Sequence, residues 1–209
     1  MIRSLPFVSV YTYSPHGSCA ASRRSRCLRA RLKSADAGFL DRCASRARRT
    51  CEETERLREF LDARLVLVPV PGSAPRRTGA ESVTEQLVAA LLHHGFGSAV
   101  WTGLRRVHAV PRSAAAKPCE RPTVHRHYVS MAVERAGPVL DQVLLVDDVI
   151  TKGRTLLAAA SRLQTAFPAA RIRAFALLRT RGLDPEVERL LDPCLGEIRW
   201  RAGDAQRRP

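Results

Sequence analysis

The sequence predicts an α/β fold, an open and mainly parallel sheet with flanking helices, together with a small N-terminal extension. Short apolar runs alternate with helical segments in the order strand, helix, strand, loop, strand, helix, strand, which favours right-handed crossovers in one sheet. Three of the runs are rich enough in apolar residues to be buried core strands. A chain of 209 residues with a hydrophobic share of 45% is sufficient for one such domain.

The N-terminal part, residues 1–62, is the predicted basic extension or hood, and residues 63–209 are the main domain. The first twenty residues have the proline and glycine content of an extended or loop-like entry. Two basic stretches follow, Ser22–Lys33 and Arg42–Arg49. The second stretch lies in a helix expected from about Ala37 to Ala63, because apolar residues there form an imperfect buried stripe.

The main domain contains the remaining expected elements. The strands are expected at Leu65–Val70, Ala99–Trp101, Val143–Val146, Ile172–Leu178 and, at an edge of the sheet, Glu197–Trp200. The helices are expected at Val83–His94, Leu156–Phe167 and Pro185–Leu191, the last capped by Asp184. The proline-containing segment Arg105–His127 is expected to be a long irregular loop, and such loops are usually functional or mobile.

The formal charge of +15 favours anionic partners, namely phosphorylated small molecules, nucleic acid or an anionic membrane surface. GC-rich coding can also supply arginine, so the charge alone is weak evidence. The six cysteines contain no Cys-x-x-Cys pair, which argues against a zinc ribbon. We find no signal peptide and no run long enough to cross a bilayer, so we expect a cytoplasmic protein with free thiols and no membrane partner.

Residues Val143–Thr155 contain the chemically most informative pattern. A buried strand carries Asp147 and Asp148 to its carboxyl end, where open α/β sheets bind ligands. The turn Thr151–Thr155 then leads into a helix whose first N–H groups form an anion site. Carboxylates beside such a site suit hydroxyl groups or Mg²⁺, so a ligand with a phosphate and a ribose diol fits both halves. The alternative is an ordinary strand-turn-helix whose aspartates cap the helix or face water.

This segment resembles the phosphoribosyl pyrophosphate signature of type I phosphoribosyltransferases, which has four hydrophobic residues, two acids, two hydrophobic residues and a Thr/Gly/Thr loop. The resemblance implies that Asp147 and Asp148 are the catalytic acids, which hold the ribose hydroxyls and help to place Mg²⁺, directly or indirectly. It also implies a phosphoribosyl pyrophosphate-binding segment made of Val149, Ile150, Thr151, Lys152, Gly153, Arg154 and Thr155. Lys152 is expected to point outward, because the backbone does most of the phosphate binding.

Two further segments fit the same resemblance. Pro71, Gly72 and Ser73 follow the first core strand, where the family binds pyrophosphate with backbone amides. Arg105 and Arg106 follow the second strand and are expected to neutralise the leaving pyrophosphate. In the family, an arm near this position closes over the substrate and excludes water. The alternatives are an ordinary Pro-Gly turn and a solvated basic loop.

Among these enzymes, the chain is most similar to the competence protein F family, also described as amidophosphoribosyltransferase-like. Val68–Pro71 matches its Val-Pro-Val-Pro strand, and Leu32–Asp36 (Leu-Lys-Ser-Ala-Asp) is similar to its Leu-Lys-Tyr-x-Gly-Asp segment. The chain departs from the family in lacking a four-cysteine zinc module, and Arg77–Glu81 only partly matches its Arg-Gly-Phe-Asn-Gln motif.

We therefore expect an enzyme that binds phosphoribosyl pyrophosphate with Mg²⁺ and transfers the phosphoribosyl group to a nitrogenous acceptor, releasing pyrophosphate. The alternative is a regulatory or nucleic-acid-binding protein of the same fold that uses the site as a sensor. No motif names the acceptor. Relatives often dimerise, so the resemblance also implies a homodimer. His125-x-His127 is assigned no metal site, because no third ligand is evident. His93-His94 is also assigned none, because it ends a helix before Gly95, where cationic residues suit the helix dipole.

Overall fold

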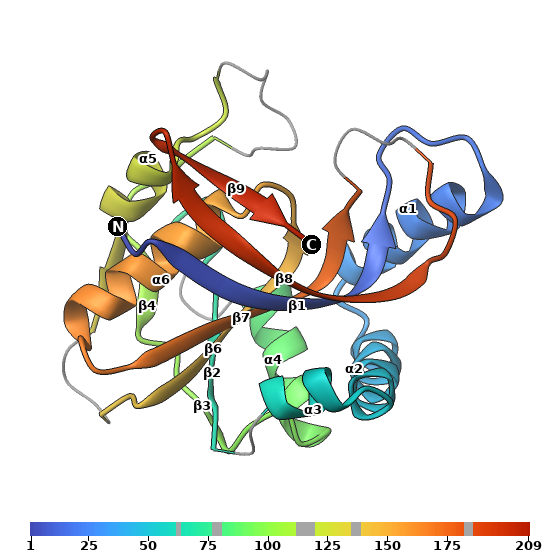
Figure 1. Ribbon diagram of the computed structural model, residues 1–209, viewed down its shortest axis with the longest axis horizontal. Helices are drawn as coiled ribbons and strands as arrows, with labels where there is room; N and C mark the ends of the chain where they lie inside the picture. The colour runs from blue at the N-terminus through green and yellow to red at the C-terminus, as the bar shows by residue number, and fades with distance from the viewer. Residues whose placement is uncertain (62–63, 77–80, 112–119, 135–138, 182–185) are drawn as a thin grey trace.

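The computed structural model describes residues 1–61, 64–76, 81–111, 120–134, 139–181 and 186–209. Its centre is a seven-stranded sheet (Figure 1). In sheet order, the strands are β3 (Ala99–Val100), β2 (Val66–Pro69), β6 (Gln142–Ile150), β7 (Arg171–Thr180), β1 (Ser4–Tyr13), β8 (Leu191–Arg201) and β9 (Asp204–Arg208). From β3 to β1 in this order the strands run parallel. The strand β8 is antiparallel to β1, and β9 is antiparallel to β8. The α/β class with a mainly parallel sheet is therefore confirmed.

Helices cover both faces of this sheet (Figure 1). One face packs against α1 (Ala20–Lys33), α2 (Ala37–Glu52), α3 (Glu55–Phe60) and α4 (Val83–His93). The other packs against α5 (Val124–Val129), α6 (Arg154–Ala166) and a small antiparallel pair, β4 (Leu104–Arg106) and β5 (Met131–Val133). The fold thus has two hydrophobic cores, one on each side of the sheet.

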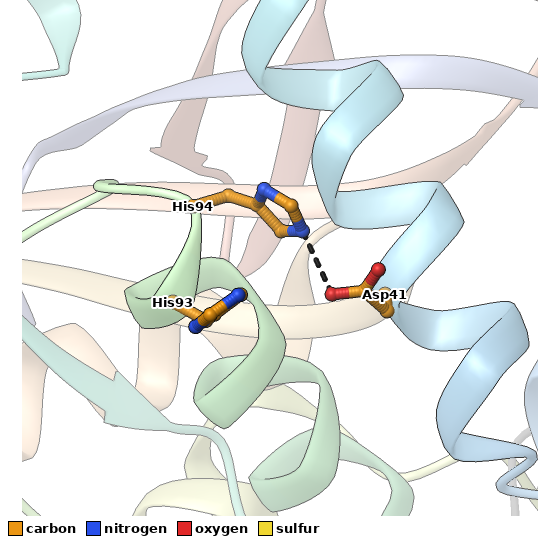
Figure 2. Close-up of side chains that lie close together, drawn as sticks. All are labelled: Asp41, His93 and His94. Atoms are coloured by element: carbon orange, nitrogen blue, oxygen red, sulfur yellow. Dashed lines mark hydrogen bonds and ion pairs between the residues drawn. The ribbon is translucent and has the colours of Figure 1, made fainter.

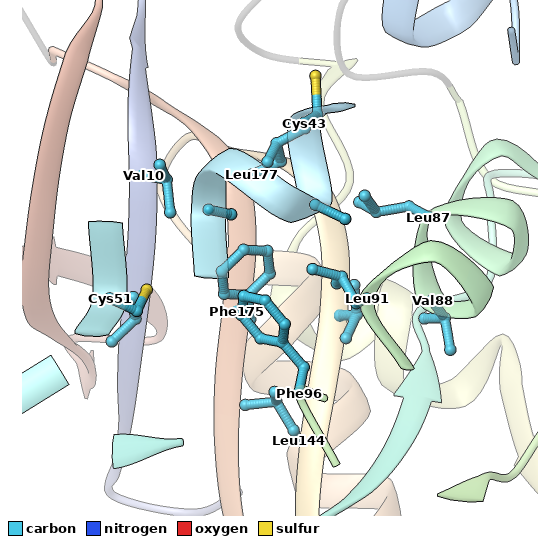
Figure 3. Packing of buried hydrophobic residues seen from close by; sticks show 14 of the residues in the cluster. Val10, Cys43, Cys51, Leu87, Val88, Leu91, Phe96, Leu144, Phe175 and Leu177 are labelled. Atoms are coloured by element: carbon cyan, nitrogen blue, oxygen red, sulfur yellow. The ribbon is translucent and has the colours of Figure 1, made fainter. Parts of the chain in front are cut away.

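The first core lies beneath α2 and α4 (Figure 3). Phe96 and Phe175 meet there edge to face, with ring centroids 5.4 Å apart. Cys43 and Cys51 of α2 are also buried in this core, and burial raises the pKa of their thiols to about 11 and about 12. All five cysteines that the structure describes are free thiols, as expected. These two therefore act as small hydrophobic residues rather than as nucleophiles.

Four predicted strands and two predicted helices are confirmed, in β2, β3, β6, β7, α4 and α6. The strand β6 is longer than the predicted Val143–Val146 and continues to Ile150, so both aspartates lie within it. The chain leaves β2 through α4 towards β3 and leaves β6 through α6 towards β7, in opposite directions along the sheet. The strand order therefore reverses between β2 and β6, and such a reversal leaves a crevice at the carboxyl ends of the strands.

The strand β1 corrects the predicted separation of residues 1–62 from residues 63–209. It lies inside the sheet, where Phe7 is paired with Ala174 of β7 on one side and with Gly196 of β8 on the other. Phe7 is fully buried. The N-terminal region therefore shares a sheet and both cores with the main domain.

Buried polar residues explain why this strand was expected to be an extended or loop-like entry. Ser9 and Thr12 interrupt the apolar run in the sequence, yet both are fully buried. The N–H of Thr12 donates to the carbonyl of Leu190 at 2.9 Å, beside the start of β8. Since the partner strand lies almost 180 residues away, this compensation is invisible in the local sequence pattern.

The helix predicted at Ala37–Ala63 is interrupted. Its first part, α2, ends at Glu52, and α3 begins after Thr54. Residues 62–63 lie outside the described residues. The N-cap of α2 is Asp36, whose carboxylate accepts from the N–H of Phe39 at 2.9 Å.

The helix predicted at Pro185–Leu191 is wrong for its described part. Residues after Glu186 are irregular and the last one begins β8, while the predicted cap and first residue lie outside the described residues. The Glu186 carboxylate instead accepts from the N–H groups of Ser18 and Cys19 at 2.8 and 3.0 Å. It therefore holds the start of α1 rather than forming a helix of its own.

Three other predictions need correction. Glu197–Trp200 belongs to β8 and is not at the edge, because β9 pairs along its outer side. Arg105–His127, predicted to be an irregular loop, contains the last two residues of β4 and the beginning of α5, and residues 112–119 lie outside the described residues. Residues 77–80 of the partial family motif also lie outside the described residues. His125 and His127 lie on a helix, so they do not share one side of a strand. Among the described residues, no helix combines the length and apolar character needed to cross a bilayer.

Candidate functional site

The strands β2 and β6 are parallel neighbours, so the loops that follow them begin at the same end of the sheet, the carboxyl ends of the strands. Pro69 is paired with Val146, and the N–H of Val70 donates to the carbonyl of Val146 at 2.9 Å. Pro71–Ser73, which follow β2, and the acidic pair, which lies near the end of β6, are therefore on adjacent strands. The two predicted segments meet where the strand order reverses, which is where open α/β sheets bind ligands; this position is called the crevice below.

The acidic pair lies at the end of β6 that faces this crevice. Asp148 is buried and Asp147 is half-buried, and the N–H of Asp148 donates to Oδ1 of Asp147 at 2.9 Å. Burial and the neighbouring Asp148 carboxylate raise the pKa of Asp147 well above its usual value. Two carboxylates held together in this way are stabilised by a cation or by hydroxyl donors. The donor set therefore fits both roles expected of it, a ribose diol and Mg²⁺.

Lys33 supplies a cation to this pair from a distant part of the sequence. It is the last residue of α1, and its Nζ forms an ion pair with Oδ2 of Asp148. The preceding Leu32 is fully buried, which fixes the end of α1 against the sheet. Sequence reasoning noted the Leu32–Asp36 segment only as a family similarity and did not place Lys33 at the site.

The predicted phosphate loop turns through Gly153. This residue has φ +84°, in the left-handed region, and it is the N-cap of α6. No side chain caps α6 at Gly153, and the first turn of this helix has no acidic residue. Among the described residues, neither an N-cap side chain nor an acid of the first turn occupies the N–H groups at the start of α6, which suits an anion.

Side chains of the same loop are held by the C-terminal strand. Nε and Nη2 of Arg154 donate to the two carboxylate oxygens of Asp204, each at 2.6 Å. Nζ of Lys152 lies 3.8 Å from the same carboxylate, and its side chain is 63% exposed. A Cβ at Gly153 would lie 2.7 Å from Ile198 of β8. The strands β8 and β9 thus brace the loop, and Arg154 is engaged by Asp204.

The two predicted arginines of β4 have different environments. Arg106 is buried, and its guanidinium donates to the carbonyls of Gly72 and Pro71 at 2.8 and 3.3 Å. Burial lowers its pKa to about 10, and the nearby Asp147 opposes that shift. Arg105 points the other way, is exposed, and pairs with Glu134 at 2.8 Å. The structure therefore brings Arg106, and not Arg105, to the predicted pyrophosphate loop.

His127 is a further residue of this site that sequence reasoning missed. It is buried, and its Nε2 lies 3.4 Å from the Thr155 hydroxyl. Burial, with the positive charges of Arg106, Arg154 and Arg126, lowers its pKa to about 4. The ring is therefore neutral at pH 7. The His125-x-His127 pattern drew notice in the sequence, but only a helical reading separates a buried His127 from an exposed His125.

A second cluster lies away from this crevice, between α2 and the end of α4 (Figure 2). Asp41, His93 and His94 each offer one ligand atom, and these atoms lie within 4.8 Å of one another. Nε2 of His94 and Oδ1 of Asp41 are 2.8 Å apart. Asp41 and His93 are exposed, and the bonded pair links the two helices at the surface. Asp41 is the third candidate ligand that was not evident in the sequence.

Comparison of the sequence with protein-family models and with curated proteins gave no match in either case. Those comparisons therefore do not show a family for this chain.

Proposed function

We propose that the protein binds phosphoribosyl pyrophosphate with Mg²⁺ in this crevice and transfers the phosphoribosyl group to a nitrogenous acceptor, releasing pyrophosphate. We also propose that the fold is that of the type I phosphoribosyltransferases. One observation carries the proposal: the acidic pair of β6 and the loop after β2 lie on adjacent strands where the strand order reverses.

Each part of phosphoribosyl pyrophosphate would contact a group suited to bind it. The uncapped N–H groups at the start of α6 would bind the 5′-phosphate, and Gly153 would allow the backbone to approach it closely. Asp147 and Asp148 would accept hydrogen bonds from the ribose hydroxyls and help to hold Mg²⁺, which would offset the charge of the pyrophosphate. The loop Pro71–Ser73 would contact the pyrophosphate.

The chain's own residues would contribute chiefly by positioning and by charge. Arg106 fixes the carbonyls of Pro71 and Gly72 from the buried side, so the loop is preorganised before the ligand arrives. His127 is neutral at pH 7 and lies beside Thr155, so it would orient the phosphate loop rather than transfer a proton. As the acceptor nitrogen attacks C1′, the bond from C1′ to the pyrophosphate oxygen would break, and the proton lost by the nitrogen would pass to the released pyrophosphate or to water.

Calorimetric titration of phosphoribosyl pyrophosphate with Mg²⁺ tests the binding step. We expect the wild type to bind and Asp147→Asn/Asp148→Asn to lose about 100-fold or more in affinity, since two charge-assisted contacts are removed. Asp141→Asn is the matched control, because Asp141 is exposed and directly precedes the first residue of the same strand. No binding by the wild type would refute the proposal.

Turnover is tested separately, by following pyrophosphate release with ammonia, free nucleobases and orotate as acceptors. Release with any of them supports the transferase. Tight binding of the donor without release in the whole panel would instead favour the sensor, the alternative that keeps the site and drops the reaction.

A further inference from the structure

The second turn of α2 and the end of α4 bring one carboxylate and two imidazoles together (Figure 2). The ligand atoms of Asp41, His93 and His94 all lie within 4.8 Å of one another. The rings of the two histidines meet edge to face, with centroids 5.1 Å apart. Two imidazoles and one carboxylate are a donor set that Zn²⁺ accepts in proteins.

The backbone that carries these side chains is held in place on both helices. Gly95, with φ +77°, ends α4, and the following Phe96 is fully buried. Leu40 of α2 and Leu91 of α4 are buried in the same first core. Nη1 of Arg48 on α2 also donates to the carbonyl of Gly95 at 2.7 Å. An ion between the two helices would therefore need only rotations of side chains at the surface.

The spacing of the ligand atoms is close to that of a zinc site. With bonds from Zn²⁺ to nitrogen and oxygen of about 2.0–2.2 Å, the ligand atoms around a tetrahedral ion lie about 3.4 Å apart. The 2.8 Å between Nε2 of His94 and Oδ1 of Asp41 and the 4.8 Å limit for the whole set bracket this value. Asp41 and His93 are exposed, so their side chains are free to make the adjustment. A fourth position would remain for water.

Helix packing alone explains part of this arrangement. The hydrogen bond between His94 and Asp41 links α2 to α4, and a histidine near the C-terminus of a helix is favoured by the helix dipole. That explanation does not involve His93, which takes no part in this hydrogen bond. Figure 2 shows both imidazoles projecting from the end of α4 towards Asp41. The convergence of a second imidazole on one carboxylate is the feature that points to a metal ion.

We propose that Asp41, His93 and His94 bind one Zn²⁺ ion, which ties α2 to α4. The ion would replace the hydrogen bond between Asp41 and His94. Nε2 of His94 would bind the metal through its lone pair, and the ring proton would lie on Nδ1, so that the imidazole stays neutral. Asp41 would bind as the carboxylate and offset part of the charge of the ion.

The zinc site would be separate from the crevice. The helix α4 returns the chain from the carboxyl end of β2 to the start of β3, so its last residues lie near the amino ends of these strands. In agreement, the N–H of Ser98 donates at 2.9 Å to the carbonyl of Leu65, which directly precedes β2. The acidic pair lies towards the opposite, carboxyl end of β6. The inference therefore does not depend on the proposed function.

Calorimetric titration of Zn²⁺ into the full chain tests the site, in the presence of a phosphine reductant and excess Mg²⁺. Mg²⁺ prefers oxygen ligands, so it fills carboxylate sites without competing for imidazoles. With three protein ligands, we expect one ion per chain and a Kd on the order of 1 μM. His93→Gln and Asp41→Asn should each weaken binding about 100-fold, because one of three ligands is lost. The matched controls His108→Gln and Asp141→Asn remove an exposed imidazole and an exposed carboxylate elsewhere and should leave the affinity unchanged.

Thermal unfolding gives a second readout, because ligands from two helices meet only in the folded chain. Zn²⁺ at about 100 times Kd should raise the Tm of the wild type by roughly 5–10 °C and that of His93→Gln far less. Co²⁺ in place of Zn²⁺ reports the ligand type, and we expect visible absorption bands without a near-ultraviolet band from thiolate ligands.

Three results would overturn the proposal. The first is a wild type that binds no Zn²⁺. The second is His93→Gln binding as tightly as the wild type, which would leave only the hydrogen bond that links the helices. The third is a thiolate band in the Co²⁺ spectrum, which would assign the ion to cysteines instead.

Discussion

Several ionisable residues of the crevice lie next to one another, and burial together with neighbouring charges shifts the pKa values of Asp147, Arg106 and His127. Asp148 contacts Lys33 on one side and Asp147 on the other. Arg106 and His127 are both buried nearby, and the hydrogen bond from Arg106 to the carbonyl of His127 joins them. Because buried charges are costly unless they are paired, this group ties the stability of the fold to pH.

Asp147→Asn should stabilise the free protein at neutral pH. In the wild type, the pKa of the Asp147 carboxyl is raised in the folded state, so the folded chain binds the proton more tightly than the unfolded chain. The free energy of unfolding therefore falls as pH rises above the pKa of this group in the unfolded chain. The amide carries no charge, so we expect a gain of about 1 kcal/mol at pH 7, or about 2–4 °C in Tm. Urea unfolding at pH 5 and pH 8 measures it. Asp141→Asn should leave the free energy of unfolding unchanged at both pH values. A destabilised Asp147→Asn would contradict the prediction.

His127→Gln should remove a pH dependence from the acid side of neutrality. The pKa of His127 is lowered to about 4 in the fold, against about 6.5 when unfolded, so the unfolded chain takes up the proton first. The wild type therefore loses roughly 2–3 kcal/mol of stability from this group as pH falls from 6.5 to 4, and has the full contribution above pH 6.5. The measurement is the wild-type-minus-variant stability across this window. The exposed His108→Gln should give a flat difference; a flat difference for His127→Gln would exclude the mechanism.

At the scale of elements, the antiparallel ribbon β8–β9 supports the phosphate loop. Ile198 of β8 packs against the position where a side chain at Gly153 would stand, and Asp204 of β9 holds Arg154. The loop thus depends on a ribbon whose contacting residue Asp204 lies 50 residues after Arg154 in the sequence. Substitutions in the ribbon should reach the site through this contact.

Gly153→Ala tests two reasons for glycine at this position, its left-handed φ and its close approach to Ile198. A left-handed φ costs a non-glycine residue about 1 kcal/mol, and overpacking against the buried Ile198 adds about 1–3 kcal/mol. Gly203→Ala is the matched control, because Gly203 has φ +76° and nothing within 4 Å of a new Cβ. Chemical denaturation should show a loss of about 2–4 kcal/mol at Gly153 and about 1 kcal/mol at Gly203. Equal losses would mean that the contact with Ile198 relaxes freely.

The elements that the sequence predicted well are those whose pattern is local. The apolar runs of β2 and β6 and the helical segments around them needed no partner to be recognised. Adjacent acids before a Thr/Gly turn likewise placed Asp147, Asp148 and Gly153 in one crevice. Lys33 and His127 could not be placed there, because α1 and α5 reach the site only through long-range packing.

At the scale of the whole molecule, β1 joins the N-terminal region and the rest of the chain into one sheet. It pairs with β7 along one of its sides and with β8 along the other, so the parallel strands and the β8–β9 ribbon are joined through it. Its residues also enter both cores, with Val8 in one and Phe7 in the other. A boundary at residue 62 would cut through this arrangement.

The fragment of residues 63–209 should therefore not fold on its own. Without β1, the outer edge of β7 loses its hydrogen-bonding partner and β8 has no parallel sheet to join. Phe7→Ala in the full chain probes the same dependence more gently, and should cost about 3–5 kcal/mol because the ring is fully buried. Circular dichroism and amide exchange test both: the fragment should lack a cooperative transition, and the variant should keep one at lower denaturant. A cooperatively folded fragment would restore the two-part organisation.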